Sequence, residues 1–309
     1  MRRLLLTPRQ RLVALVLVLF AFGCAEPAGD ATTEADEIRI VSLSPAISRT
    51  LLDLGLEERI VGRSPFCDFL DPAIPVVGDL HGAQFERLIE LDPTHVLVQS
   101  PQAGIDPGLR ELADEHGWKL AGWRGVNTID DIEAMVRELP TVLCEPGSDE
   151  LAALGARSAE LLNEIAAALA PGETDDQVWR GRTLLVYAMS PLGVFGRGTY
   201  LNDVLVRCGA GNAVEAEGWV QLTLEDVTRL DPGAIILIRP GPRNQPAEPV
   251  DPIDAAGALA TLDIEAARAE RIAILSHPDA LMPSTAISEV AAELRDVLRR
   301  LNRPSEPGS

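Results

Sequence analysis

Residues 85–98 read FERLIELDPTHVLV, and residues 224–237 read LEDVTRLDPGAIIL. Both stretches follow one pattern, apolar-Glu-x-apolar-x-x-Leu-Asp-Pro, and both continue into a short apolar run. The apolar positions recur at helical spacing, the proline ends each helix, and the runs Val96 to Val98 and Ile235 to Ile238 suit buried parallel strands. Each copy is therefore predicted to be a helix, a tight turn and a strand.

The beginnings of the two halves also match. Residues 38–43 (IRIVSL) predict a strand, and a helix follows from Ser44 until Gly55. Residues 183–187 (TLLVY) predict the matching strand, and a helix over residues 201–208 ends at Gly209. Ser44 and Pro45 suit a helix start, since a hydroxyl caps the first turn and proline is tolerated there. We expect two α/β lobes of related topology with central, mostly parallel sheets.

A long segment of strong helix formers separates the two halves. Residues 148–170 read SDELAALGARSAELLNEIAAALA and stop at Pro171-Gly172. A helix of this length spans roughly 35 Å, which is enough to join two lobes. The predicted organisation is a lobe over residues 37–147, an inter-lobe helix over 148–171, a second lobe over 172–303 with a final helix from Ser284 to Leu301, and a tail over 304–309.

The N-terminus has the pattern of an export signal. Arg2, Arg3, Arg9 and Arg11 precede an uncharged run from Leu12 to Phe22, which is only half the length that spans a bilayer. The run ends at Gly23-Cys24, which resembles the lipobox of bacterial lipoproteins. We predict a signal peptide over residues 1–23, a lipid anchor on Cys24 and a polar tether over 24–36. The alternative is an ordinary secretory signal with Cys24 incidental.

Charge and composition exclude several classes of protein. The chain of 309 residues carries 27 Lys and Arg against 47 Asp and Glu, a net charge of −20. Removal of residues 1–23 takes away four arginines and no acids, which leaves 23 − 47 = −24. Such a chain repels phosphate backbones, so nucleic acid is not an expected partner. A hydrophobic content of 46% predicts a packed core rather than disorder.

Cysteine and histidine spacing gives no metal motif. Cys67, Cys144 and Cys208 remain after Cys24 and allow at most one disulfide, whose pairing the spacing does not choose. The histidines are scattered without ligand spacing, and only His81 and His277 fall in candidate site loops. We therefore expect no bound metal ion and no catalytic cofactor.

Several segments together resemble one family, the bacterial ABC-transporter substrate-binding proteins for iron chelates and vitamin B12. The resemblance implies a class III periplasmic-binding-protein-like fold, a monomer without enzymatic activity, a ligand cleft between the lobes and delivery to a permease dimer in the membrane. The matching segments are residues 39–47, 54–56, 60–62, 66–69, 77–79, 86–98, 198–205, 209–212 and 225–237.

The resemblance gives one glutamate in each repeat copy a specific role. In this family a surface glutamate on each lobe docks onto arginines of the permease, and Glu86 and Glu225 occupy the same place in the two copies. The alternative is that each glutamate only complements the dipole of its helix.

The family's ligand lies at loops that follow the strands, where open α/β sheets place their sites. Five of the ten aromatic residues after the signal fall in such loops, namely Phe66, Phe69, Trp123, Tyr200 and Trp219. They suggest apolar platforms for a large ligand, and core packing is the alternative, above all for Phe69. The predicted ligand-binding residues are Ser44, Pro45, Phe66, Asp68, Asp79, Trp123, Arg124, Arg197, Tyr200, Trp219 and Arg239.

Three kinds of chelate fit this resemblance. The segment Phe66 to Phe69 is similar to a Tyr-Cys-Asp-Tyr segment of corrinoid-binding relatives, and aromatic walls suit a corrin ring, so a corrinoid is the first candidate. A ferric siderophore is the second, because Arg124, Arg197, Arg239 and Arg243 could meet its anionic oxygens. Haem is expected to need an axial ligand such as a first-lobe tyrosine, but both tyrosines, Tyr187 and Tyr200, lie in the second half.

Two other classes are an exported enzyme and a sensor lipoprotein that keeps the fold. Gly196-x-Gly198 lacks the third glycine of a dinucleotide fingerprint, and no GxSxG, HExxH or P-loop lysine occurs. The sequence therefore favours binding over catalysis. A neighbouring permease and ATPase locus would separate transport from both alternatives.

Overall fold

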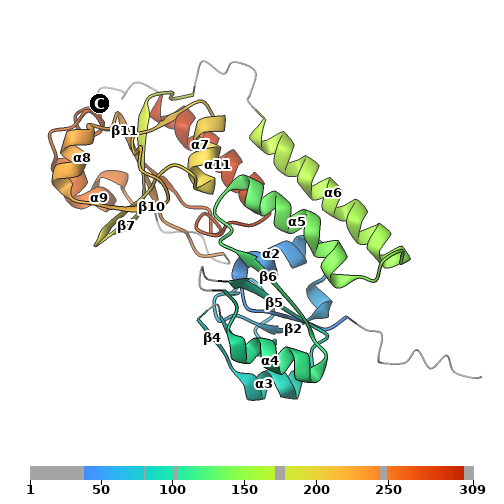
Figure 1. The fold of residues 1–309 in the computed structure, drawn as a ribbon. Helices are drawn as coiled ribbons and strands as arrows, with labels where there is room; N and C mark the ends of the chain where they lie inside the picture. Colours follow the sequence, from blue (N-terminus) through green and yellow to red (C-terminus); the bar gives the residue numbers. More distant parts are fainter. Residues whose placement is uncertain (1–37, 80, 101–103, 171–177, 244–248, 303–309) are drawn as a thin grey trace, which may run out of the picture. The chain divides into compact units, whose positions relative to one another are not determined.

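A computed structural model describes residues 38–79, 81–100, 104–170, 178–243 and 249–302 (Figure 1). The first lobe is built on a parallel sheet of four strands in the order β2-β1-β5-β6. These strands are β1 (Ile40–Ser42), β2 (Ile60–Arg63), β5 (His95–Ser100) and β6 (Lys119–Arg124), and a small hairpin pairs β3 (Gly78–Asp79) with β4 (Gly82–Ala83).

Three first-lobe helices, α2, α4 and α5, begin at residues whose side chains cap them. Ser44 accepts a hydrogen bond from Ile47 N at the start of α2, Asp106 accepts from Gly108 N at the start of α4, and Thr128 forms a capping box at α5. The predicted helix start at Ser44 and Pro45 is confirmed. The helices are α2 (Pro45–Asp53), η2 (Glu57–Arg59), α3 (Phe85–Leu91), α4 (Pro107–His116) and α5 (Ile129–Leu143).

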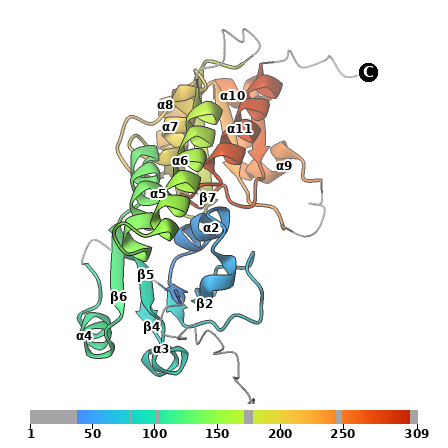
Figure 2. The ribbon, with the colours of Figure 1, turned by 90° about the vertical axis from the view of Figure 1, so that its right-hand side faces the viewer.

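The inter-lobe segment is a single helix, α6 (Asp149–Leu169), capped by Ser148. It runs side by side with α5, as Figures 1 and 2 both show. Ser158 of α6 donates to Val136 O at 2.7 Å, and Arg157 donates to Asp53 O at 3.1 Å. On its other side α6 packs against α11 (Ile287–Leu301) of the second half. This helix therefore contacts elements of both lobes.

The second lobe has a mixed sheet in the order β10-β8-β7-β11-β12, with β9 pairing beside β7. Strands β7, β11 and β12 are parallel, whereas β8 runs antiparallel to both of its neighbours, β7 and β10. The strands are β7 (Arg182–Met189), β8 (Leu192–Phe195), β9 (Gly211–Asn212), β10 (Trp219–Leu222), β11 (Ala234–Ile238) and β12 (Ile272–Leu275). The helices besides α11 are α7 (Tyr200–Arg207), α8 (Leu224–Leu230), α9 (Pro252–Ala256), η3 (Gly257–Thr261) and α10 (Glu265–Arg268).

The apolar core follows the two faces of each sheet. Alternate strand residues point to opposite faces, so Ile40 joins one hydrophobic cluster while Val41 joins another, and Ile236 and Ile235 divide in the same way. The largest cluster includes residues of α2, α5, α6, α7 and α11 and thus runs through both lobes. The two lobes belong to one compact unit that begins at Ile38.

The predicted fold class, two related α/β lobes joined by one long helix, is confirmed. The signal peptide, the tether, the anchor at Cys24 and the tail over 304–309 lie outside the described residues. Among the helices that the structure describes, none is both long and apolar enough to cross a bilayer.

Candidate functional site

The carboxyl ends of the two sheets face each other across the lobe interface. Beyond β6, the carbonyl of Asn127 accepts from Tyr200 N at 2.6 Å, which joins the loop before α5 to the start of α7. Beyond β2, Asp68 pairs with Arg243 of the loop after β11 at 2.9 Å. These two contacts join loops of the first lobe to loops of the second.

Ser44 and Pro45 are structural at this interface. Ser44 is fully buried, caps α2 and donates to Oε1 of Gln99 at 3.1 Å, while Pro45 is half-buried in the first helical turn. The hydroxyl of Ser44 is therefore already engaged by Gln99 and by the first turn of α2.

The loop after β2 presents one aromatic ring and holds the other. Phe66 is 64% exposed, whereas Phe69 lies under the guanidinium of Arg243, which is 4.8 Å from the ring centre. Cys67 between them is buried against Ser48, and burial raises the pKa of its thiol. Phe66 is thus the side chain of this loop that is free to meet a ligand.

A cavity of about 190 Å³ opens beside the ends of β1 and β5 in the first lobe. Asp79, His81, Phe85, Gln99 and Ser100 line it, and Asp79 accepts from His81 N at 2.8 Å. Asp79 is the predicted ligand residue of this cavity, and its lining combines polar groups with an aromatic ring. Leu80, which the sequence places in the same loop, lies outside the described residues.

The last two residues of β6 have different surroundings. Trp123 is buried, and its indole nitrogen donates to Glu138 of α5 at 2.8 Å. Arg124 is exposed, and within the described chain it makes no ion pair. Trp123 therefore packs the sheet against α5, while Arg124 remains available at the interface.

The aromatic residues of the second lobe form one group. Trp219 on β10 is 45% exposed, and its ring centre lies 4.5 Å from that of Phe195 and 5.0 Å from that of Tyr187. Gly193 makes room for Tyr187, because a Cβ there would lie 2.4 Å from the phenol ring. Trp219 consequently presents an exposed indole that packs against the rings of Phe195 and Tyr187.

The prediction that Tyr200 lines the cleft is wrong. Tyr200 is fully buried at the first position of α7, its ring contacts Phe195, and its hydroxyl donates to Ala280 O at 2.8 Å. Burial raises the pKa of this phenol. The hydroxyl supports the turn after β12 instead of meeting a ligand.

The second-lobe arginines fall into two kinds. Arg197 and Arg239 are exposed and make no ion pair among the described residues, and Arg239 lines a cavity of about 400 Å³ with Ser276 and Val250. Arg243, by contrast, is half-buried and bound to Asp68 and Asp279. His277 lies beside Glu289 at 3.2 Å rather than in an open loop.

Glu86 and Glu225 lie in the first turns of α3 and α8, and both are exposed. Arg229 of α8 pairs with Glu225 at 3.2 Å. Glu86 makes no ion pair within the residues that the structure describes. The two predicted docking residues thus have equivalent positions and unequal charge environments.

Sequence reasoning missed the polar residues that join the lobes, above all Arg49, Asp279 and Glu289. Arg49 is the one basic residue of α2, which is otherwise packed against the core, and this was the available signal.

Cys67, Cys144 and Cys208 are free thiols, and the described residues contain no cluster of three His, Cys, Asp or Glu that could hold a metal ion.

Comparisons with known proteins agree with this architecture. The family profile described as periplasmic binding protein matches residues 40–248. The vitamin B12-binding protein of Salmonella typhimurium is 30% identical over 232 residues, 73% of this chain and 77% of that relative. The uncharacterized ABC transporter substrate-binding lipoprotein YvrC of Bacillus subtilis is 24% identical over 214 residues, 67% of this chain and 65% of that relative.

A solved structure shares the fold. The periplasmic heme-binding protein RhuT from Roseiflexus sp. RS-1, in apo form, superposes with a TM-score of 0.64 at 21% identity and covers 86% of this chain and 100% of that one. The chain belongs to the periplasmic binding protein family, because the profile matches more than half of it. The resemblance to substrate-binding proteins for iron chelates and vitamin B12 is thereby confirmed, and its relatives are binding proteins rather than enzymes.

Proposed function

We propose that this chain is an exported, lipid-anchored substrate-binding protein that captures a corrinoid between its lobes and delivers it to an ABC importer. The observation that carries the proposal is a pair of exposed aromatic side chains, Phe66 at 64% and Trp219 at 45%, one on each lobe. Large apolar rings on opposite walls suit a flat macrocycle. The vitamin B12-binding relative at 30% identity supports the same ligand class.

The first-lobe cavity is too small to enclose a large ligand, which supports a ligand that extends out of it. Sites for drug-sized ligands usually measure about 300–1,000 Å³, and the first-lobe cavity of about 190 Å³ is smaller. That cavity can take a side group of a large ligand while the ring lies against Phe66 and Trp219.

The test is isothermal titration of the mature chain with cyanocobalamin, ferric siderophores and haemin. We expect saturable binding of cyanocobalamin. Phe66→Ala and Trp219→Ala should each lower its affinity about 10-fold or more, since each change removes an aromatic ring that the bound ligand would cover. Val206→Ala, which removes an exposed apolar side chain of α7 that lines neither cavity, serves as the control. Absence of heat with every corrinoid would remove this proposal.

A ferric siderophore is the second candidate ligand, and one observation favours it. Arg124, Arg197 and Arg239 are exposed and make no ion pairs in the described chain, although the protein is strongly acidic. Guanidinium groups match carboxylate and catecholate oxygens. If an anionic chelate is bound instead, Arg124→Gln and Arg197→Gln will each weaken it, and the effect will shrink with added salt.

Haem has less support from the side chains. Both tyrosines belong to the second lobe, Tyr200 is buried with its hydroxyl engaged, and Tyr187 packs edge-on against Phe195. A shift of the Soret band on mixing with haemin would restore this candidate.

We assign the anchoring and docking roles to Cys24 and to Glu86 and Glu225. The lipoprotein relative YvrC supports an anchor in this group of proteins, and metabolic labelling with a palmitate analogue tests it, with Cys24→Ser as the control. The exposed glutamates of α3 and α8 provide one anionic point on each lobe for a permease dimer. The competing sensor or enzyme roles predict ligand binding without uptake, which a transport assay distinguishes.

A further inference from the structure

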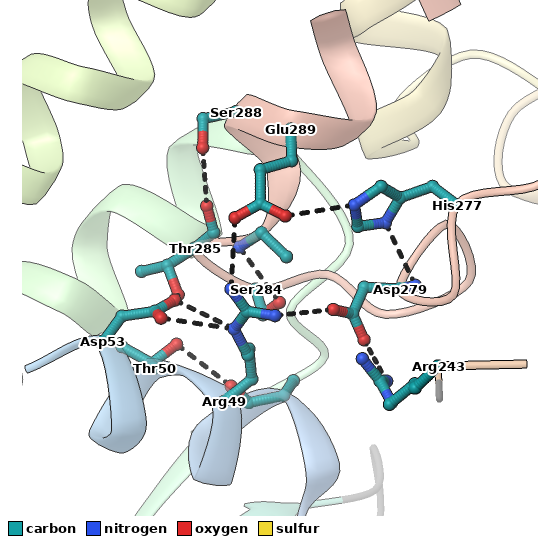
Figure 3. A network of polar contacts seen from close by, with 12 residues as sticks. Arg49, Thr50, Asp53, Arg243, His277, Asp279, Ser284, Thr285, Ser288 and Glu289 are labelled. Carbon is teal, nitrogen blue, oxygen red and sulfur yellow. Dashed lines mark hydrogen bonds and ion pairs between the residues drawn. The ribbon is translucent and has the colours of Figure 1, made fainter. Parts of the chain in front are cut away.

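A fully buried carboxylate lies where the lobes meet. Asp279 belongs to the turn after β12, and its side chain is 0% exposed. Its Oδ2 accepts from Nη1 of Arg49 at 2.8 Å, and its Oδ1 accepts from Nη2 of Arg243. Figure 3 shows both guanidinium groups directed at this carboxylate. Arg49 belongs to α2 of the first lobe and Arg243 to the second, so one carboxylate binds an arginine from each lobe.

Arg49, which binds Asp279, is itself held by other carboxylates. Arg49 also binds Asp53 at 3.1 Å and Glu289 at 3.2 Å, and Asp53 accepts from Thr285 (Figure 3). Burial by itself lowers the pKa of Arg49, but the bond to Asp53 and the attraction of the nearby carboxylates outweigh it and raise that pKa. Buried charges persist only when they are paired and hydrogen-bonded in this way. Asp279 is therefore held in a fixed place and orientation.

Arg243 reaches from this fixed point to the predicted ligand loop of the other lobe. Its Nε donates to Oδ1 of Asp68 at 2.9 Å, and its guanidinium lies over the ring of Phe69. The side chain is only 15% exposed, so the cation–π contact and the ion pair are partly shielded from water. Phe66, three residues from Phe69, keeps its exposure.

We propose that Asp68, Phe69, Arg243 and Asp279 form an inter-lobe clasp that positions the Phe66 loop for ligand before ligand arrives. Asp279 fixes Arg243, and Arg243 holds the first-lobe loop by a charge and by a ring. A loop already held in its binding position loses less conformational entropy when the ligand binds. In this arrangement Arg243 is a positioning residue, whereas Phe66 makes the contact.

Hydrogen exchange of the ligand-free, mature chain tests the clasp directly. The peptide covering residues 64–70 contains the turn bonds Cys67 N to Ser64 O and Leu70 N to Cys67 O. In Arg243→Met we expect about 10-fold faster exchange in this peptide and unchanged exchange in α6. The matched control is Arg268→Met, which breaks an exposed ion pair with Asp263 elsewhere on the second lobe. Exchange of the loop within two-fold of wild type would overturn the clasp.

A milder variant covers the case in which Arg243→Met does not fold. Asp68→Asn leaves Arg243 and Asp279 paired and removes only the exposed end of the clasp, where Asp68 is 71% exposed. We expect a rise of about three-fold in exchange of residues 64–70. Arg243→Lys keeps the charge but not the fork that reaches both carboxylates, so its loop exchange should lie between wild type and Arg243→Met. If residues 64–70 exchange at the wild-type rate in either variant, the proposal is contradicted.

A binding measurement separates the clasp from the identity of the ligand, since positioning for a ligand rests on the proposed function while loop exchange does not. With cyanocobalamin as the probe, Arg243→Met should lower affinity about 10-fold and Arg268→Met should not. A loop that exchanges faster in Arg243→Met with unaltered cyanocobalamin affinity would overturn the positioning role. If the wild type does not bind cyanocobalamin, the corrinoid proposal fails, and the exchange experiment still decides the clasp.

Discussion

Helices α3 and α8 are both seven residues long, and each ends at an aspartate, Asp92 or Asp231, with φ of 42° and ψ of 64°. An arginine at the start of the first strand of each lobe supports this end: Arg39 lies directly before β1, and Arg182 is the first residue of β7. Arg39 donates to Leu91 O at 2.6 Å, and Arg182 donates to Leu230 O at 2.9 Å. A cation at a helix C-terminus is favourable because it complements the helix dipole. The two copies therefore share both a sequence pattern and the contacts that stop the helix.

The same two copies differ in their other side chains. Glu225 is paired with Arg229 and Glu86 has no ion pair in the described chain; Thr223 forms a capping box and Gln84 makes no side-chain cap. The strand that follows begins with His95 in one copy and Ala234 in the other. The residues that end each helix thus give the two copies the same backbone conformation there. The side chains at the other positions differ between the lobes.

The largest expected effect comes from reversing the charge of both exposed glutamates. Glu86→Arg with Glu225→Arg should abolish uptake through the cognate permease, because arginines on the partner would then be repelled, while ligand affinity stays within two-fold. The measurement is transport of radiolabelled cyanocobalamin into vesicles that contain the permease and its ATPase. Among single changes, we expect Glu86→Arg to reduce uptake more than Glu225→Arg, since Arg229 already offsets the charge of Glu225.

Two changes on the same helices serve as controls for this charge reversal. Glu90→Arg in α3 and Thr228→Arg in α8 alter exposed positions outside the first turns. They should leave uptake close to wild type. Normal uptake by the double Glu86 and Glu225 variant would remove the docking role from both residues.

The second prediction concerns His95, the first residue of the strand that follows α3. Burial and then the charge of Lys119 lower the pKa of His95 to about 4, whereas an unfolded histidine titrates near 6.5. The unfolded chain therefore takes up a proton that the folded chain refuses, and stability is lost as the pH falls from about 6.5 to about 4. Between pH 7 and pH 5 we expect His95 to account for a loss of about 2 kcal/mol.

Replacing His95 by the residue of the other copy tests this difference. His95→Ala should be about 2 kcal/mol less sensitive to the change from pH 7 to pH 5 than wild type, measured as the free energy of unfolding in urea. His116→Ala, an exposed histidine of α4, is the control and should match wild type. Parallel pH profiles for His95→Ala and wild type would show that His95 takes up its proton as readily in the folded chain as in the unfolded chain.

Much of this comparison could be read from the sequence, and the physical reason is local. In both copies Leu-Asp-Pro ends a helical apolar pattern and a short apolar run follows, so α3, α8, β5 and β11 were predictable. The antiparallel pair β8 and β10 was not predicted, because its pairing depends on contacts between separate segments. Helical periodicity also does not say which way the first residue of a helix points. The inward position of Tyr200 was therefore not predicted.

The site was less predictable than the fold. Loop position predicted Phe66, Arg124, Trp219 and Arg239 as ligand residues, and all four are exposed. It gave no indication that Arg243 would bind Asp68 and Asp279, since those contacts join residues 175 and 36 positions apart. Pairing between distant charges requires the tertiary structure, whereas the sequence showed only which aromatic and charged residues fall in the loops.

The smallest expected effect tests the helix starts. Thr223→Gln, which copies the first lobe into the second, should lower the free energy of unfolding by about 1 kcal/mol, because the side-chain bond to Asp226 N at 3.2 Å is lost. The reciprocal change Gln84→Thr should raise it by only about 0.5 kcal/mol. The gain is smaller because the third residue of α3 is Arg87, which cannot return a hydrogen bond to the cap as Asp226 does in α8. Equal and opposite effects of the two changes would mean that the capping residue alone, without its acidic partner, accounts for the difference between the copies.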